Sequence, residues 1–475
     1  MRRAAGLLAA TVLAAAVFRF WALGFYNDDY ALLAALARAE PDGLLRGFAA
    51  EFAKLFWSRP LDILFFPGLY ALFGAHPLPY HVMARLLDLA CAWQFYRWLK
   101  EEGVGDNTAL LAGIFVALYP NHDATRLWPS GLVAQTSLAG TLWGLRLFRR
   151  RDRAAGCLVF LASMLLYEAP SLLVLTAPLL AWLKDRKSAL RTTWPLLAAF
   201  TVGAAWQRVI VPLAFAVERH PVSLSPGHAF KVLGTGFECT FANRLAHFIA
   251  KGTQFAWGSF SAFDWAVCLL VAGALAVQAK SLAKRYEPPR ASPALPLALA
   301  LFLLGYAPYF FDASYMPTVF SANNRLNMTG ALGGALFFAW LSGRWQKRGP
   351  VLAGLLAAAF LLTGWTSNAQ YAQAYSKQKE ILDALEPQLP PDAKMILLYG
   401  FPERVGAAVV FESAFDLEGA LALRGHRVKA RVGQGRMRYE KESAVFVWYG
   451  EEKIPYDGLY IYDHATRAMI KSHAN

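Results

Sequence analysis

The sequence contains few charged residues for its length. Only 17% of its 475 residues are Asp, Glu, Lys or Arg, whereas soluble domains contain about a quarter. Hydrophobic residues make up 56% and aromatic residues 14%, and apolar runs of membrane-spanning length recur from end to end. This composition excludes a disordered chain and a nucleic-acid-binding protein, and it predicts an α-helical polytopic membrane protein.

Cysteine is also scarce, and its positions follow no pairing pattern. The four cysteines are Cys91, Cys157, Cys239 and Cys268, and three of them lie in apolar runs. Their spacing matches neither a disulfide framework nor a zinc site. We therefore interpret them as small hydrophobic residues.

Acidic residues are deficient in only one part of the chain. After position 369 there are 14 basic and 14 acidic residues, so the first 369 residues hold 33 basic and 19 acidic ones and carry the whole net charge of +14. Basic clusters such as "MRR", "RRRDR" and "RWQKR" fall at every second predicted turn. The positive-inside rule then places the N-terminus in the cytoplasm and the region after 368 outside, in an inner or plasma membrane protein.

Eleven apolar segments are predicted to span the membrane, the first as an uncleaved span rather than a signal peptide. The approximate spans are 4–24, 78–99, 107–120, 127–148, 154–167, 169–183, 193–216, 262–280, 292–311, 326–343 and 349–367. Two short helices at 154–183 keep both flanking basic clusters inside. They put the turn at Tyr167–Pro170 below the outer surface, so Glu168 is expected to face a cavity. Residues 217–261 are assigned to the outer side.

Two further regions lie outside the membrane in this interpretation. The first outer loop, 25–77, contains two stretches with the spacing of amphipathic helices and a third short, half-buried piece. The tail, 370–475, has a polar helix near 370–386 and a helix near 416–424, with strands at "KMILLYG", "AAVVF", "HRVKARV", "AVFVWYG" and "GLYIYD". We predict a transmembrane domain at 1–369 and a small soluble α/β domain at 370–475, without a 34-residue repeat.

The stretch "GFYNDDYALLAAL" carries an acidic pair directly after the first span. Asn27 is a good N-cap, and carboxylates at Asp28 and Asp29 suit the first turn of a helix, so capping alone is one explanation. Catalysis is the other. Adjacent helical residues point about 100° apart, so at most one of the pair can face a given substrate.

More polar residues collect on the same predicted outer side. They are His122, Asp123 and Arg126 after the third span, Glu168 at the sunken turn, and Arg325 before the tenth span. Each has a plain structural alternative, such as a turn or a headgroup anchor. Arg85 and Asp88, three residues apart, can pair with each other. Together, the outer residues assemble carboxylates and arginines around one cavity.

The order of these motifs resembles a known membrane-enzyme family. The matching stretches are "NDDY", "WSRPLDILFFPGLYALFGAHPLPYH", "LYPNHDATRLWPSG", "LLYEAPSLLVLTAPLLAWL" and, more loosely, "ANNRLNMTGALGGALF". They resemble GT-C-type glycosyltransferases, and in particular the bacterial relatives of the transmembrane O-mannosyltransferases that carry tetratricopeptide repeats. The resemblance covers about a third of the chain, and the repeat domain of that family is absent here.

The resemblance implies transfer of a sugar from a polyprenyl-phosphate donor at the outer face. The acidic motif of the family falls on Asp28 and Asp29, and its late arginine falls on Arg325. Its His-x-x-His-Glu-like stretch falls on Asn121, His122 and Asp123, and its later acid falls on Glu168, with Tyr167 where a Lys usually precedes it. Because a different C-terminal domain is present, neither a mannose donor nor a protein acceptor is carried over.

These residue types suit a single-step inverting transfer. An acceptor hydroxyl needs a carboxylate base, for which Asp29 or Asp28 is predicted, and a leaving phosphate needs cations, for which Arg325 and Arg126 are predicted. His122, Asp123 and Glu168 would line the site. A second acid, among Asp28, Asp123 and Glu168, either binds a divalent metal or orients the acceptor. The expected partners are a polyprenyl-phosphate sugar donor, a lipid, glycan or protein acceptor, and membrane lipids, but no nucleic acid.

Three other functions compete with a glycosyltransferase of the cell envelope. A transporter is expected to have internal repeats and polar residues near the bilayer midplane, whereas the polar residues here collect at the outer ends. An O-antigen ligase or polymerase is not expected to carry an acidic pair after its first span. A structural scaffold leaves the outer carboxylates and arginines unexplained.

Overall fold

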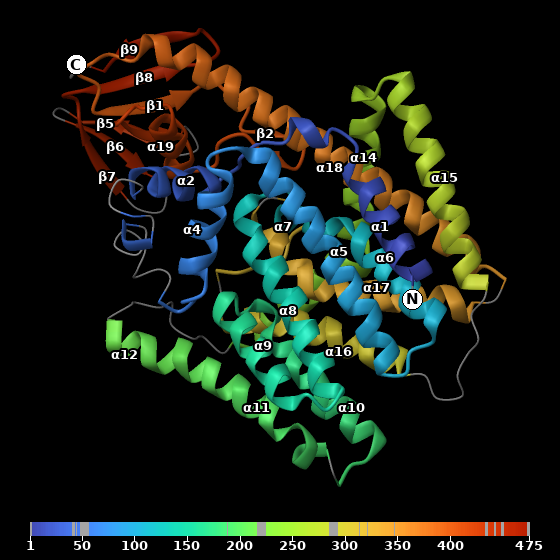
Figure 1. Ribbon diagram of the computed structural model, residues 1–475. Coiled ribbons are helices and arrows are strands. Elements are labelled where there is room, and N and C mark those ends of the chain that lie inside the picture. The colour runs from blue at the N-terminus through green and yellow to red at the C-terminus, as the bar shows by residue number, and fades with distance from the viewer. Residues whose placement is uncertain are drawn as a thin grey trace.

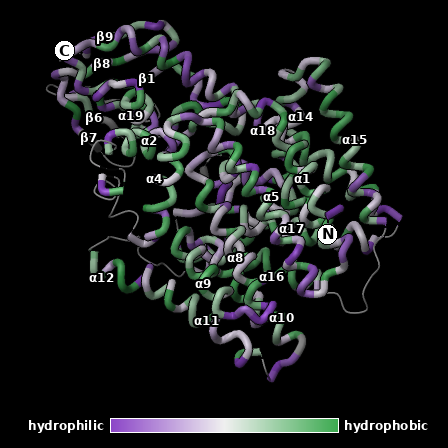
Figure 2. The backbone as a smooth tube through the Cα atoms, viewed as in Figure 1, coloured by the Kyte–Doolittle hydropathy of each residue, from purple (hydrophilic) through white to green (hydrophobic). Residues whose placement is uncertain are grey.

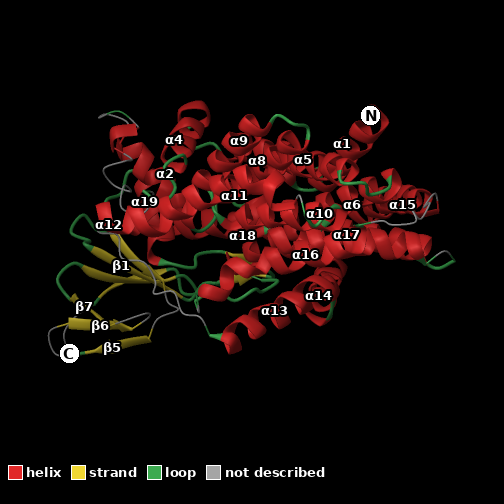
Figure 3. Cartoon of the chain, turned by 90° about the horizontal axis from the view of Figure 1, so that it is seen from below, coloured by secondary structure: helices red, strands yellow, loops and turns green. Residues whose placement is uncertain are grey.

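The chain folds into a large helical part followed by a small sheet region near its C-terminus (Figure 1). The computed structural model describes residues 2–39, 43, 45–47, 57–187, 189–215, 225–284, 293–312, 314–320, 322–345, 347–432, 436–440, 443–447 and 451–472. The strands gather at one end of the molecule (Figure 3), and the N-terminus lies on the other side of the helical part.

All eleven segments predicted as spans are largely helical. Their helices are α1 (Arg2–Ala16), α5 (Pro77–Glu101), α6 (Asp106–Leu118), α8 (Leu132–Arg149), α9 (Arg153–Leu166), α10 (Thr176–Lys184), α11 (Ala189–Ala205), α15 (Ala262–Lys284), α16 (Ala294–Tyr306), α17 (Met328–Arg344) and α18 (Gly349–Leu385). Within the described residues, four helical stretches are long and apolar enough to cross a membrane: Ala189–Phe215, Ala262–Lys284, Ala294–Phe311 and Gly349–Gln388. The chain is therefore a helical, membrane-embedded protein, and the count of eleven spans stays a prediction.

The predicted break between two short helices at 154–183 is present. The helix α9 ends at Leu166, and Tyr167 has an extended backbone with φ −157°. A 3-10 helix, η5 (Ala169–Leu175), then leads into α10. Pro170 lies in the first turn of η5, where its missing N–H costs no hydrogen bond.

The last membrane helix continues without a break into the sheet region. The helix α18 has 37 residues, which corresponds to a length of roughly 55 Å at 1.5 Å per residue. A bilayer core is only about 30 Å thick, so the helix extends well beyond it. The polar helix predicted near 370–386 is thus not a separate element, and the predicted domain boundary at 369 falls inside α18.

The first outer loop contains two of the three predicted short pieces. The first is α2 (Asp28–Ala39) and the third is α4 (Asp62–Phe73). The second predicted helix, 43–57, falls largely outside the described residues. Helix α4 contains Pro67 and stands beside α2 (Figure 1).

Two helices occupy a region that the sequence analysis assigned only to the outer side. They are α13 (Pro226–Phe241) and α14 (Asn243–Ser259). The Ser225 hydroxyl caps α13 by accepting a hydrogen bond from the His228 amide, 3.3 Å away. Helix α14 packs closely on α18 at Gly252, where an added Cβ would lie 2.8 Å from the Thr366 hydroxyl.

The C-terminal region is a small α/β unit, as predicted. Its main sheet has the order β4-β1-β8-β9, with β1 parallel to β4 and β8. The five predicted strands correspond to β1 (Met395–Tyr399), β3 (Ala408–Val409), β4 (Lys429–Val432), β6 (Ser443–Val447) and β8 (Leu459–Asp463), and the predicted helix is α19 (Ala414–Leu423). The sequence analysis missed β2 (Arg404–Val405), β5 (Arg436–Tyr439), β7 (Glu451–Pro455) and β9 (Ala468–Lys471).

The hydrophobic core has two main parts. One lies among the membrane helices and includes Leu8, Phe115 and Trp365. The other joins α2 to the C-terminal region through Tyr30 and Leu417. Hydrophobic residues dominate α15, whereas hydrophilic residues are more frequent in the sheet region (Figure 2). The second core packs α2, which begins with the acidic pair, against the C-terminal region.

Candidate functional site

Helix α2 begins at the acidic pair, but Asn27 does not act as the predicted cap. Asn27 has the left-handed backbone conformation, with φ +47°, which Asn tolerates better than most residues. Its side-chain amide instead donates a hydrogen bond to the Glu412 carboxylate in the C-terminal region, 3.0 Å away. The start of α2 is therefore attached to the C-terminal region.

Asp29 is buried and fully engaged by the backbone. One carboxylate oxygen accepts a hydrogen bond from the Tyr26 amide at 2.8 Å, and the other accepts from the Ser130 amide at 2.7 Å. Burial raises the pKa of Asp29 to about 8, although both amides oppose this shift. Asp29 thus joins the start of α2 to the turn that precedes α8.

Asp28 points in a different direction and lines a cavity of about 500 Å³. Within the described residues, its carboxylate makes no hydrogen bond or ion pair. Burial raises the pKa of Asp28, and the positive charge of Arg325 lowers it. The two adjacent aspartates therefore have different surroundings, and only Asp28 faces the cavity.

The cavity gathers charged and aromatic side chains from several elements. Its charged lining residues are Asp28, Arg59, Asp62 and Arg325, and its aromatic ones are Phe66, Trp128, Tyr167 and Phe415. Arg325 lies in the 3-10 helix η8 (Ala322–Asn327), just before α17, and Phe415 lies in α19. Segments almost 400 residues apart in the sequence thus share one cavity.

Arg325 is half-buried. In the part of the chain that the structure describes, its guanidinium makes no hydrogen bond or ion pair. Leaving a partly buried charge unpaired is costly, which makes such a group a candidate for binding an opposite charge. Asp28 and Arg325 are thus two charged groups of opposite sign in the cavity that are available to a ligand.

Arg59 and Asp62 are site residues that the sequence analysis did not single out. Arg59 makes a bidentate ion pair with Glu168, with both N···O distances 2.8 Å, and its guanidinium lies 4.4 Å from the centre of the Tyr167 ring. Asp62 is 1% exposed, and one of its carboxylate oxygens has no partner among the described residues. Burial raises its pKa to about 7. The available signal was the "RPLD" quartet, which places two charges in an apolar stretch.

Glu168 contributes to the site through Arg59. It was expected to face a cavity, but its neighbour Tyr167 is the residue that lines the cavity. The Glu168 carboxylate is engaged by both nitrogens of the Arg59 fork. Glu168 therefore fixes the orientation of an arginine at the edge of the cavity.

Arg126, which the sequence analysis predicts to bind a donor phosphate, is buried and is not among the described residues that line the cavity. Its guanidinium donates to Asp88 at 3.2 Å and to the carbonyl oxygens of Tyr119 and Val116 at 2.7 and 2.5 Å. Asp88 also accepts from Arg85 at 2.9 Å, which confirms the predicted Arg85–Asp88 pair. Since each of its three nitrogens already donates a hydrogen bond, we interpret Arg126 as a structural residue, and its contact with a donor phosphate stays a prediction.

His122 and Asp123 are buried behind the cavity wall instead of lining it. The ring of His122 is hydrogen bonded to the Thr125 hydroxyl at 3.0 Å, and Thr125 lines the cavity. Asp123 accepts a hydrogen bond from Asn324, whose carbonyl oxygen also accepts from the Ala124 amide. Asn324 precedes Arg325, so Asp123 helps to hold the turn that carries this arginine.

No preformed metal centre is found among the described residues, since no three His, Cys, Asp or Glu side chains cluster there. The three carboxylates named as alternative ligands differ in their surroundings. Asp28 faces the cavity, Asp123 is buried behind it, and Glu168 is bound to Arg59. They do not form one ligand set.

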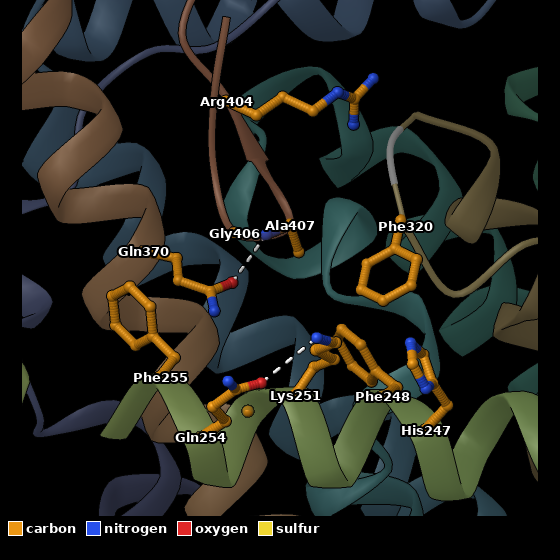
Figure 4. A pocket seen from close by; sticks show the side chains of 11 residues that line it. His247, Phe248, Lys251, Gln254, Phe255, Phe320, Gln370, Arg404, Gly406 and Ala407 are labelled. Atoms are coloured by element: carbon orange, nitrogen blue, oxygen red, sulfur yellow. Dashed lines mark hydrogen bonds between the residues drawn. The ribbon is translucent and has the colours of Figure 1, made fainter. Parts of the chain in front are cut away.

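A second cavity of about 520 Å³ lies between α14, α18 and β2 (Figure 4). It is lined by Lys251, His247 and Arg404 together with three phenylalanines, and Gln370 accepts a hydrogen bond from the Ala407 amide at its edge. None of its described lining residues is a carboxylate. It therefore lacks a group comparable to Asp28.

Comparison with known proteins does not assign the chain to a family. No protein-family model matches it, and no curated protein matches it either.

Proposed function

We propose that the chain is an integral-membrane glycosyltransferase of GT-C type with eleven spans. It moves a sugar from a polyprenyl-phosphate-linked donor to an acceptor hydroxyl in the cell envelope. One observation carries this proposal: the unpaired Asp28 carboxylate shares a cavity of about 500 Å³ with the arginines Arg325 and Arg59. A base and a phosphate-binding pair are the two requirements of the reaction.

Asp28 is the base in this mechanism. The acceptor oxygen attacks the anomeric carbon of the donor sugar while Asp28 takes the hydroxyl proton. The bond from this carbon to the phosphate oxygen breaks, and polyprenyl phosphate leaves with the electron pair. The attack comes from the face opposite the leaving group, so the configuration inverts. Asp29 is less suited to this role, because two backbone amides hold it and it is not among the described residues that line the cavity.

Arg325 and Arg59 bind the phosphate. A guanidinium fork matches phosphate oxygens and stabilises the charge that the leaving group gains. Arg325 has no other partner among the described residues, and Arg59 is held in place by Glu168. Leu32, Phe66 and Val133 form an apolar wall that suits the lipid part of the donor.

The reaction can be tested with the purified full-length protein. We would supply a panel of polyprenyl phosphates carrying different labelled sugars and measure release of polyprenyl phosphate by the wild type and by Asp28→Asn. We expect release from at least one donor, and its loss in the variant. Absence of release from every donor, or equal release by both proteins, would overturn the proposal.

The proposed orientation has its own test. The C-terminal domain lies outside the cytoplasm and the N-terminus inside, as the distribution of basic residues indicates. A reporter fused after Asn475 should be active only outside the cytoplasm, and one fused after Arg153 only inside. If both reporters indicate the same compartment, the arrangement of spans and the outer position of Asp28 are both wrong.

A further inference from the structure

The C-terminal region is built directly onto the helix that carries Asp28. Helix α19 approaches α2 so closely that a Cβ on Gly419 would lie 2.5 Å from the carbonyl group of Tyr30. The Tyr30 hydroxyl donates to Gln378 of α18 at 3.0 Å, and Asn27 donates to Glu412. These contacts, together with Phe415 in the cavity wall, make the soluble domain a structural part of the site.

A groove of about 1000 Å³ runs between α2 and α19. Ala31 and Phe415 line both this groove and the cavity that contains Asp28. Ala31 lies three residues after Asp28 on α2, so both residues are on neighbouring parts of one helix face. The groove therefore adjoins the cavity on the side of the proposed base.

The groove carries an excess of positive charge. Arg38, Arg427 and Lys429 line it, and all three are exposed. Glu418 is the one carboxylate among its described lining residues, and the Arg431 guanidinium binds it at 2.9 Å. A negatively charged chain would meet complementary charge along this groove.

One hydrogen bond indicates whether a peptide or another kind of anionic chain binds in the groove. The open edge of a sheet is a common place for a peptide to bind, by adding a strand. Here β4 is an edge strand, but the Glu418 carboxylate already accepts the Ala430 amide at 2.9 Å. This contact closes the middle of that edge and disfavours a peptide.

We propose that the groove between α2 and α19 binds the acceptor, and that the acceptor is an anionic glycan. This inference rests on the proposed function, because it takes Asp28 as the group that receives the acceptor proton. The lipid-linked donor reaches the cavity from the membrane, whereas the groove lies on the soluble domain. The two substrates thus meet at Asp28 from different directions.

A charge-reversal variant tests the groove in the full-length protein in detergent. The variant is Arg427→Glu with Lys429→Glu. The control is Arg467→Glu with Lys471→Glu, which makes the same charge change at the opposite edge of the sheet, where β9 lies. The probe is oligogalacturonate, with neutral dextrin and polyglutamate for comparison, and binding is measured by calorimetry at two salt concentrations. We expect roughly tenfold weaker oligogalacturonate binding in the groove variant, because two attractive surface charges become repulsive. The control should bind like the wild type.

Each other result has a defined meaning. If the wild type does not bind oligogalacturonate, or if the control variant loses as much binding as the groove variant, the proposal that the groove binds the acceptor is wrong. If neutral dextrin binds as tightly as oligogalacturonate, negative charge is not what the groove recognises. If polyglutamate binds more tightly than oligogalacturonate, the acceptor is a protein instead of a glycan. Release of polyprenyl phosphate reports separately on the proposed function. If no donor is cleaved but the groove variant still loses glycan binding, the glycosyltransferase proposal fails and the glycan site remains.

Discussion

Two neighbouring regions of this protein contain aspartate and arginine, yet they differ in how these groups are used. Arg126, Arg85 and Gln135 all donate hydrogen bonds to the carboxylate of Asp88. In the cavity that Asp28 and Arg325 line, these two groups have no such partners among the described residues. Paired buried charges hold helices together, whereas charges left unpaired at a cavity are available to a substrate.

The same contrast occurs between two consecutive residues. Asp29 accepts two backbone amides and is 2% exposed, while Asp28 faces the cavity. Substitutions that remove only the proton-accepting ability should therefore affect catalysis at one position and stability at the other. The four predictions below test this contrast.

The largest expected effect is that of Asp28→Asn on turnover. The amide cannot accept the acceptor proton, so the rate of sugar transfer should fall by about 10²–10⁴. Since Asp28 has no hydrogen-bond partner among the described residues to lose, the thermal unfolding midpoint should stay unchanged. An Asp28→Asn protein that folds and retains wild-type turnover would remove Asp28 from the mechanism.

Arg126→Gln should mainly destabilise the protein. Removing one partner from a buried charge cluster typically costs about 3–5 kcal/mol. The matched control is Arg150→Gln, which breaks an exposed pair with Glu101 and should cost less than about 1 kcal/mol. Denaturation in detergent measures both. A stable Arg126→Gln protein with weakened donor binding would return Arg126 to the phosphate site.

Asp29→Asn should have a smaller effect on stability. The amide keeps one accepting oxygen, but its NH₂ group then faces a backbone N–H, and a lost buried acceptor costs about 1–3 kcal/mol. We expect a lower unfolding midpoint and near-normal turnover of the folded protein. The reverse result, with a normal midpoint and no turnover, would identify Asp29 as the base.

The smallest expected effect is a shift in pH dependence in Arg325→Gln. Transfer requires ionised Asp28, so kcat/KM should fall on the acid side as Asp28 gains a proton. Arg325 lowers the pKa of Asp28, and its removal should raise that pKa and move the fall to higher pH. In Arg325→Lys the charge remains, so the profile should keep its position while donor use weakens. If the pH profile of Arg325→Gln does not move, the charge of Arg325 does not act on the pKa of Asp28.

Much of the fold could be predicted from hydrophobic patterning. Long apolar runs have one stable conformation in a membrane, the helix, because its backbone satisfies its own hydrogen bonds. The missed helices α13 and α14 have a weaker signal: the buried residues of α14 are Leu245, Phe248, Gly252 and Ala256, spaced by three or four among polar residues. The continuity of α18 was missed because its composition changes from apolar to polar while its conformation does not.

The residue types of the site could be predicted from the sequence, since carboxylates and arginines beside apolar runs are rare and indicate function. The role of each residue could not be predicted in this way. Whether Asp28 or Asp29 faces a cavity depends on the rotation of α2, which α19 and the Ser130 turn determine from distant parts of the chain. Likewise, the sequence singles out Arg126 and not Arg59. In the structure, Arg126 is surrounded by Asp88 and two carbonyl oxygens, whereas Arg59 lines the cavity. Hydrogen-bond partners are acquired only when the chain packs, and those partners decide which charges remain for chemistry.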